Sequence, residues 1–176
     1  MTVTYDPDLD EALPTAAPPA VRWTPGLPGS DSLTDLLRLT PRDRWLLDLL
    51  AEHQALTTDQ IAGLAFDSTE AAHKRLRRLT DQAVLANFHI LRVGDDARLH
   101  PGRVCWTVGW VGATYLAARN DEPIPWPGTA IGRMERLAVR PRLTYWLSVN
   151  GVFTGLIAHS RRTPGARLDT WWSGCL

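Results

Sequence analysis

LTPRDRWLLDLLAEHQALTTDQIAGLAFDSTEAAHKRLRRLTDQAVLANFHIL, residues 39–91, is the stretch that decides the fold of this chain. Its apolar spacing predicts three helices followed by a strand. Thr40 is placed to cap the first helix, and Thr57 with Gln60 forms a capping box at the start of the second. Ser68 supplies an N-cap for the third helix. A short helix, a turn and a longer helix in this order predict a helix-turn-helix unit.

The third predicted helix separates apolar from basic side chains. At 100° per residue, one narrow arc holds Ala72, Leu76, Leu79 and Ala83. Lys74, Arg77 and Arg78 point the other way. In a helix-turn-helix protein the last helix enters the DNA major groove, where arginine pairs with guanine edges or with phosphates.

A β-hairpin is predicted after the third helix, with strands over 84–91 and 103–108 and a loop over 93–102. This hairpin would be the wing of a winged helix-turn-helix. We expect Arg75 and the wing residues to lie at DNA phosphates. The residues predicted to contact DNA are His73, Lys74, Arg75, Arg77, Arg78, Arg92, Arg98 and Arg103.

The basic helix has a second interpretation. A basic run is often a solvated face, and Glu70 and Asp81 flank this one and could pair with it. Residues 40–92 hold seven Lys or Arg and seven Asp or Glu, whereas a DNA-binding domain is often clearly basic. Four of those seven basic residues lie within 74–78, which favours DNA contact. Helix-turn-helix folds also serve as plain interaction modules, so both interpretations stay open.

Charge is balanced overall but unevenly spread. The formal net charge is zero and the pI is about 7.0, so no global field attracts nucleic acid or a membrane. Residues 1–39 hold six acidic and two basic side chains, and residues 133–176 hold seven arginines and two acidic side chains. The C-terminal end is therefore a second candidate surface for DNA.

Composition also predicts the cellular setting. The two cysteines, Cys105 and Cys175, form neither a metal-ligand spacing nor a disulfide framework, which indicates a reducing interior. The N-terminus is acidic and broken by proline, unlike a signal peptide. The apolar run over 146–158 is too short to span a bilayer. A soluble, cytoplasmic protein is the expectation.

The chain divides into four predicted segments. Residues 1–30 are a disordered, proline-rich acidic arm, 31–120 the winged helix-turn-helix domain, 121–131 a proline-rich linker, and 132–176 a C-terminal helix and strand segment. The fold class is mainly α with a small β-hairpin wing, that is, α+β.

Outside the first three helices, a fourth is predicted over 110–119 and is weakened by Gly112. The C-terminal segment has a helical stripe broken or started at Pro141, and a strand over 167–172. The stripe consists of Leu143, Trp146, Leu147, Asn150, Phe153 and Ile157. The tandem Trp171 and Trp172 either pack back onto this helix or form a patch that binds a partner.

Six segments together resemble a known family. They are LTPRDRWLLDLL, ALTTDQIAGLAF, AAHKRLRRLTDQAVL, VCWTVGWVGATYLA, LTYWLSVNGVFTGL and RLDTWW, within residues 36–172. The sequence resembles the replication-relaxation family, winged-helix proteins encoded largely on plasmids and integrative elements of actinobacteria. The resemblance implies a DNA-associated role in plasmid replication, maintenance or transfer.

The sequence departs from that family at two places. Tyr145 stands where the family has a histidine ahead of the pair Val149 and Asn150. Family members continue beyond the tryptophan into an acidic, nuclease-like region, whereas the sequence here ends at Leu176, so the resemblance carries over no activity of that region.

The sequence contains no recognisable catalytic pattern. The sequence has no phosphate-binding glycine loop and no zinc-type histidine pair, so no cofactor, metal ligand or catalytic residue is predicted. Tyr145, with Arg140 and Arg142 nearby, is the one tyrosine worth testing for attack on DNA, but the pattern favours a packing role.

Three hypotheses follow. The first is a non-enzymatic protein that binds double-stranded DNA, acts in replication, maintenance or control of a mobile element, and forms a homodimer. The second is an interaction module that docks a replication or conjugation protein. The third, ranked lowest, is a DNA-nicking or DNA-relaxing enzyme.

Overall fold

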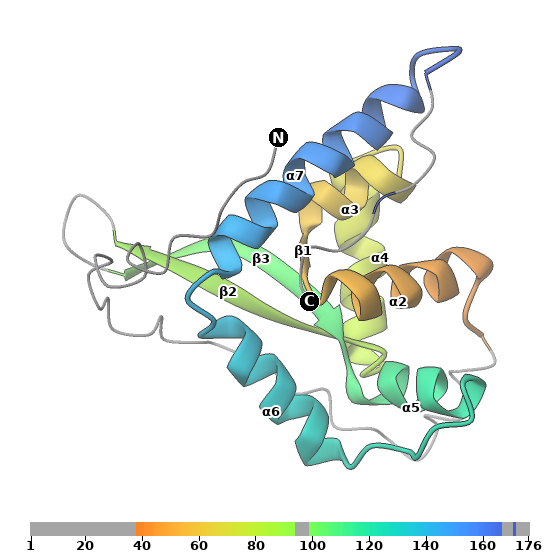
Figure 1. The fold of residues 1–176 in the computed structure, drawn as a ribbon, viewed down its shortest axis with the longest axis vertical. Helices are drawn as coiled ribbons and strands as arrows, with labels where there is room; N and C mark the ends of the chain where they lie inside the picture. The colour runs from red at the N-terminus through yellow and green to blue at the C-terminus, as the bar shows by residue number, and fades with distance from the viewer. Residues whose placement is uncertain (1–37, 94–98, 167–170, 172–176) are drawn as a thin grey trace, which may run out of the picture.

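The computed structural model describes residues 38–93, 99–166 and 171, with the backbone alone over 91–93 and 99–101. Helices predominate, and three strands form one small sheet (Figure 1). The elements in these ranges are α2 (Pro41–His53), β1 (Leu56–Thr57), α3 (Thr58–Ala65), α4 (Thr69–Asp81), β2 (Leu85–Val93), β3 (Leu99–Val108), α5 (Trp110–Arg119), α6 (Pro127–Ala138) and α7 (Leu143–Ser160). The predicted fold class, mainly α with a β-hairpin wing, is confirmed.

The sheet has the strand order β1-β3-β2, and both pairings are antiparallel. β2 and β3 form the hairpin predicted as the wing. The short strand β1 lies between α2 and α3 and pairs Leu56 with Trp106 of β3. It thereby attaches the helix-turn-helix to the hairpin and completes a winged-helix-like arrangement.

The helix starts follow the predicted capping signals. Thr40 and Asp43 form a capping box on α2, and Thr57 with Gln60 forms one on α3. The Ser68 hydroxyl accepts a hydrogen bond of 3.1 Å from the backbone N–H of Ala71 at the start of α4. These bonds satisfy N–H groups that a helix leaves unpaired in its first turn.

The first core fills the space between α2, α3, α4 and one face of the sheet. Its buried side chains include Leu46, Leu47, Leu50, Leu56, Ile61, Leu64, Ala72, Leu76, Leu79, Val84 and Trp106. All four residues of the predicted apolar arc on α4 are buried, Ala83 being just past the end of the helix.

Helix α5 spans the predicted residues, and its glycine has a packing role that the propensity argument overlooked. A Cβ at Gly112 would lie 2.3 Å from the Val84 backbone oxygen and 2.7 Å from Leu47 Cδ2. Only glycine allows α5 to approach β2 and α2 this closely.

A second core lies on the opposite face of the hairpin, which α6 and α7 cover (Figure 1). Its buried side chains are Ala55, Phe88, Cys105, Met134, Leu137, Ala138, Leu143 and Leu147. α6 begins at Pro127, inside the predicted linker 121–131, and Pro141 lies in the break before α7. The C-terminal helices therefore pack on the winged helix-turn-helix and share its sheet.

Some predictions fall outside the described residues. These are the arm over 1–30, most of the strand over 167–172, and Trp172. No helix among the described residues is long and apolar enough to cross a membrane.

Candidate nucleic-acid interface

The outward face of α4 carries four exposed basic or titratable side chains, His73, Lys74, Arg77 and Arg78. Within the described part of the chain, no acidic side chain lies within 4.0 Å of the charged groups of Lys74, Arg77 or Arg78. The pairing with Glu70 and Asp81 considered from the sequence is therefore not formed. Three cationic groups on this face remain available to an external anion.

Arg75 occupies a different environment from its basic neighbours. Its Nε donates a hydrogen bond of 2.9 Å to Asp43 Oδ1, and its Nη2 donates to Oδ2 of the same carboxylate. Asp43 is buried, and its Oδ2 also accepts hydrogen bonds from the backbone N–H of Thr40 at 2.7 Å and from its hydroxyl at 2.6 Å. The sequence grouped Arg75 with the phosphate contacts, whereas here it joins α4 to the start of α2.

In the Arg75–Asp43 pair, each group favours the charged form of the other. Burial raises the pKa of Asp43, but the hydrogen bonds from Arg75 and Thr40 outweigh burial and hold it below its ordinary 3.8. The hydrogen bond to Asp43 raises the pKa of Arg75. Both groups therefore remain charged at neutral pH, and the contact between α2 and α4 is a bidentate ion pair.

The turn between α3 and α4 is held by an arginine from the far end of α7. Arg161 Nη1 donates hydrogen bonds to the carbonyl oxygens of Gly63 at 2.9 Å and of Phe66 at 3.4 Å. These carbonyls belong to the last turn of α3, where a cation is favoured by the helix dipole. No pattern in the sequence marks this contact, because the partners lie 98 and 95 residues apart.

His73 lies at the edge of the basic face closest to the sheet. Its ring meets the ring of Trp106 edge-on at 6.3 Å, and Trp106 Nε1 donates a 2.8 Å hydrogen bond to the Thr58 hydroxyl. Trp106 is buried and connects β3 to α3. His73 is therefore exposed to solvent and also in contact with a buried residue of the sheet, Trp106.

The wing residues do not all join this face. Arg103 lines a groove of about 370 Å³ between α3, β3 and α7, together with Asp59, Ser148 and Gly151. This groove lies beside α7 and away from the outward face of α4. The side chains of Arg92 and Arg98 lie outside the described residues.

The structure corrects one expectation about Tyr145. The sequence favoured a packing role, but this side chain is 61% exposed on α7, with its ring 5.3 Å from that of Trp146. Among the described residues, no group of three His, Cys, Asp or Glu side chains is placed to hold a metal ion.

Trp171 packs back onto the helices. Its ring stacks on that of His53 with ring centres 3.8 Å apart, and lies 5.7 Å from the ring of Phe153.

A winged-helix-like protein whose α4 carries an exposed basic face is thus the class that fold and site define. The model of the replication-relaxation family matches residues 47–175. This is most of the chain, and the chain belongs to the replication-relaxation family, which connects it with the replication of plasmids and mobile elements. Comparisons with curated proteins and with solved structures gave no match.

Proposed function

We propose that this protein binds double-stranded DNA through the outward face of α4 and acts in the replication, maintenance or control of a plasmid or mobile element. The observation that supports this most directly is the set Lys74, Arg77 and Arg78. All three are exposed and lack an acidic partner among the described residues, on a helix whose other face is buried. A basic helix anchored in this way presents its charges to a DNA groove without reorganisation.

The basic residues of α4 divide into two roles in this proposal. Arg77 and Arg78 contact base edges or phosphates, and Lys74 contacts phosphate as a compact charge. Arg75 is a positioning residue, because its guanidinium holds α4 against Asp43 of α2. Its loss would change the angle at which the helix is presented.

The test is binding of the purified protein to a labelled random-sequence duplex across a salt series. If Arg77 contacts a base, Arg77→Ala should cost about 1 to 3 kcal/mol of binding free energy. If Arg77 contacts phosphate, the slope of log affinity against log salt concentration should become shallower by about one unit. Arg162→Ala removes the same charge from an exposed residue after α7, in the C-terminal end that the sequence offered as a second candidate surface for DNA. If α4 is the surface that contacts DNA, this variant should bind as wild type does. Equal affinities for wild type, Arg77→Ala and Arg78→Ala would refute the placement.

We also propose that the DNA-binding form is a homodimer joined through α7. Tyr145, Val152 and Leu156 are 61%, 63% and 49% exposed and recur at helical spacing along one face. Residues 143–160 contain no Asp, Glu, Lys or Arg, so two copies of this face meet without like-charge repulsion. A pair of recognition helices would supply the specificity that one rarely gives.

Light scattering coupled to size exclusion tests this surface. Val152→Glu with Leu156→Glu should convert a dimer into a monomer, whereas Val139→Glu, an exposed apolar residue between α6 and α7, should not. A monomeric wild type that still binds DNA would refute the dimer and leave the DNA proposal standing.

The same surface supports a second candidate function, an interaction module. In this case α7 docks a replication or conjugation protein in place of a second copy. A monomeric wild type that fails to bind DNA at low salt would favour this alternative over DNA binding.

A further inference from the structure

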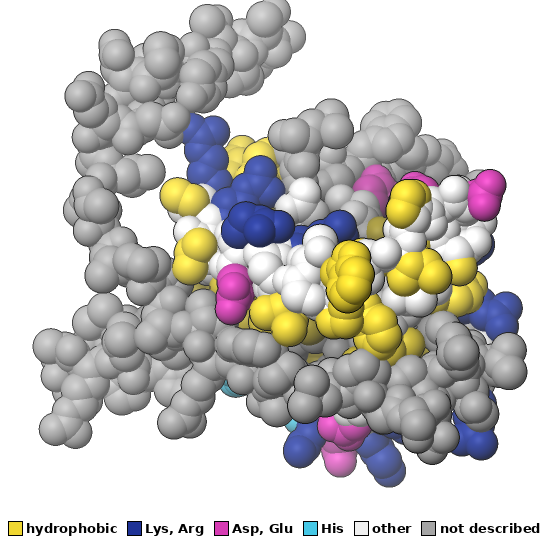
Figure 2. Space-filling view, turned by 90° about the horizontal axis from the view of Figure 1, so that it is seen from below, with side chains coloured by type: hydrophobic (Ala, Val, Ile, Leu, Met, Phe, Trp, Pro, Cys, Tyr) yellow, Lys and Arg dark blue, Asp and Glu magenta, His cyan; other side chains and the backbone are white. Residues whose placement is uncertain are grey.

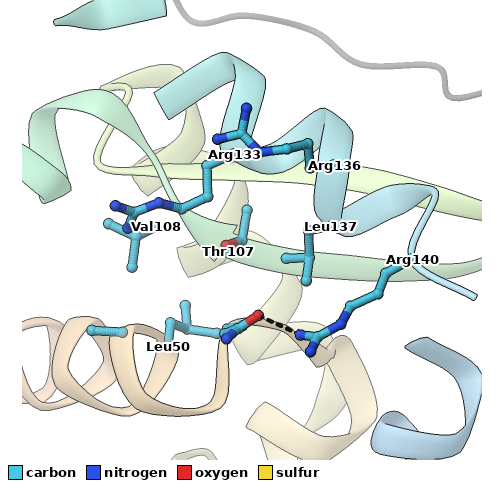
Figure 3. A pocket seen from close by; sticks show the side chains of 9 residues that line it. Leu50, Thr107, Val108, Arg133, Arg136, Leu137 and Arg140 are labelled. Carbon is cyan, nitrogen blue, oxygen red and sulfur yellow. Dashed lines mark hydrogen bonds between the residues drawn. The ribbon is translucent and has the colours of Figure 1, made fainter. Parts of the chain in front are cut away.

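A cavity of about 470 Å³ lies between α2, β3 and α6, away from the outward face of α4 (Figure 3). Its lining residues are Leu50, Ala51, Gln54, Thr107, Val108, Arg133, Arg136, Leu137 and Arg140. The neighbouring surface, seen in Figure 2 from the side of α6, has basic side chains gathered next to an apolar area. The DNA proposal makes no use of this cavity.

Three arginines from α6 and its C-terminal end line the cavity. Arg133 of α6 and Arg140, two residues past its end, extend toward opposite ends of the cavity, and the Arg136 side chain runs back along α6 toward Gly132 and Arg133 (Figure 3). Arg133 and Arg136 have no acidic partner within 4.0 Å in the described part of the chain. The cavity therefore collects positive charge that its own lining does not neutralise.

Among the described residues, none that lines the cavity is acidic. Asp48, on the same helix as Leu50, is already paired, because Arg119 Nη1 donates a 3.0 Å hydrogen bond to its Oδ2. Arg140 Nη1 donates a 3.0 Å hydrogen bond to Gln54 Oε1, a neutral acceptor that leaves the charge of Arg140 in place. The part of the wall that the structure describes therefore presents no carboxylate to an entering anion.

Gln54, which orients Arg140, has an unusual backbone. Its φ is 63° and its ψ is −48°, a region that residues other than glycine seldom adopt. This conformation makes the tight turn that ends α2, in which the backbone N–H of Ala55 donates a 2.7 Å hydrogen bond to the His53 carbonyl oxygen. One end of the cavity is therefore defined by a constrained residue that fixes an arginine.

Between the arginines the wall is apolar. Leu137 of α6 faces Leu50 of α2, and Val108 of β3 also lines the cavity (Figure 3). A single inorganic anion would use the guanidinium groups and leave this apolar surface uncovered. A ligand that joins a phosphate to a flat, largely apolar body would use both.

We propose that this cavity binds an organic phosphate of the nucleoside phosphate class. Arginine forks match phosphate oxygens in pairs, and the apolar wall accepts the base. A volume of about 470 Å³ is within the range of small-molecule sites. The site would give a protein of plasmid replication a means to respond to nucleotide supply, independent of the groove contacts made by α4.

Isothermal titration calorimetry with a deoxynucleoside triphosphate tests this assignment, with inorganic pyrophosphate and a short duplex as separate probes. We expect saturable binding of the triphosphate, at least about tenfold weaker pyrophosphate binding, and about tenfold weaker triphosphate binding for Arg133→Ala. Arg133 is exposed and unpaired among described residues, so its variant should fold normally. Arg133→Lys keeps the charge but not the fork and should recover only part of the affinity.

Two controls separate this site from general electrostatics and from the DNA surface. Arg162→Ala and the double variant Arg77→Ala, Arg78→Ala should bind the triphosphate as wild type does. No binding by wild type at millimolar triphosphate, or an equal loss in Arg133→Ala and Arg162→Ala, would overturn the proposal. A loss confined to duplex binding in Arg133→Ala would identify backbone phosphate as the ligand and would also overturn it.

Discussion

The two faces of the β2–β3 hairpin are covered by different kinds of structure. One face packs on α2, α3 and α4, each of which begins with a capping residue that the sequence reveals. The other packs on α6 and α7, which lack a side-chain cap. Long-range bonds hold this second side, such as the 2.6 Å bond from Gln60 Nε2 to the Leu147 carbonyl oxygen. Local capping signals thus mark the helices of the first face, whereas the helices of the second face carry no such signal and are held by contacts with residues distant in the sequence.

The largest expected effect tests whether the second face is a separate unit. Phe88 is fully buried in the second core, and Phe88→Ala should cost about 3 to 5 kcal/mol of unfolding free energy. Trp106→Ala removes a side chain of similar burial from the first core and should cost a similar amount. Chemical denaturation followed by circular dichroism and by tryptophan fluorescence should give one coincident transition in both variants. Two separated transitions would show that the faces unfold independently.

The ion pair between α2 and α4 belongs to the first face alone. Asp43→Asn leaves Arg75 without its carboxylate and should cost about 3 kcal/mol, at the low end for a buried pair because Arg75 is 25% exposed. The folded-state pKa of Asp43 lies below 3.8, so its contribution is present above that pH and is lost as pH falls through the folded pKa. Urea titrations at pH 7 and pH 3 should show a large wild-type advantage that shrinks in acid. An advantage independent of pH would contradict the ion pair.

Replacing one glycine on each side by alanine should change stability in opposite directions. Gly112→Ala places a Cβ 2.3 Å from the Val84 backbone oxygen and should destabilise by about 1 to 3 kcal/mol. Gly155→Ala, in the exposed part of α7, meets no atom within 4 Å and should stabilise by up to about 1 kcal/mol. Thermal unfolding should shift the midpoint down for the first and up for the second. A stabilising Gly112→Ala would mean that α5 does not pack closely on β2.

Most of the first face could be predicted from the sequence because its signals are local. Capping boxes, helix periodicity and the hairpin depend on residues a few positions apart, and α5 was located to the residue. The exposed set Lys74, Arg77 and Arg78 follows from the same periodicity. The bond from Arg75 to Asp43 spans 32 residues and could not be seen from spacing, which is why Arg75 was grouped with the phosphate contacts.

The second face could be predicted only in part. The apolar stripe of α7 was recognised, but α6 was divided between a linker and a helix because three prolines within residues 123–127 dominate its start. Pro127 occupies the first turn of α6, where a missing N–H costs nothing. The arginine cavity combines α2, β3 and α6, and nothing in the spacing of these segments indicates that they meet.

Alkaline pH should lower the free energy of unfolding through the thiol of Cys105, which is buried in the second face. Burial raises the pKa of its thiol from 9.0 to about 12, with Arg103 opposing. The folded state therefore keeps the thiol protonated while the unfolded chain ionises, so stability falls as pH rises above 9. Between pH 8 and pH 10 the wild type should lose about 1 kcal/mol more than Cys105→Ala. Equal losses in the two proteins would show that the thiol is accessible to water.

Acidic pH should lower the free energy of unfolding through His53 of the first face, and this should be the smallest effect among these predictions. This ring is buried at the end of α2 against Trp171, and its Nδ1 has no hydrogen-bond partner among the described residues. Burial lowers the pKa of His53 below 6.5, and the charge of Glu52 opposes this shift. Below pH 6.5 the imidazole is therefore protonated in the unfolded chain but stays neutral in the folded protein. Stability should therefore decline from pH 6.5 downward, well before Asp43 titrates. Urea titrations at pH 7.5 and 5.5 should show a smaller loss in His53→Phe, which keeps the stacking without the charge. If acid weakens both proteins equally in this range, the sensitivity lies elsewhere, and the contrast between an acid-sensitive first face and an alkali-sensitive second face fails.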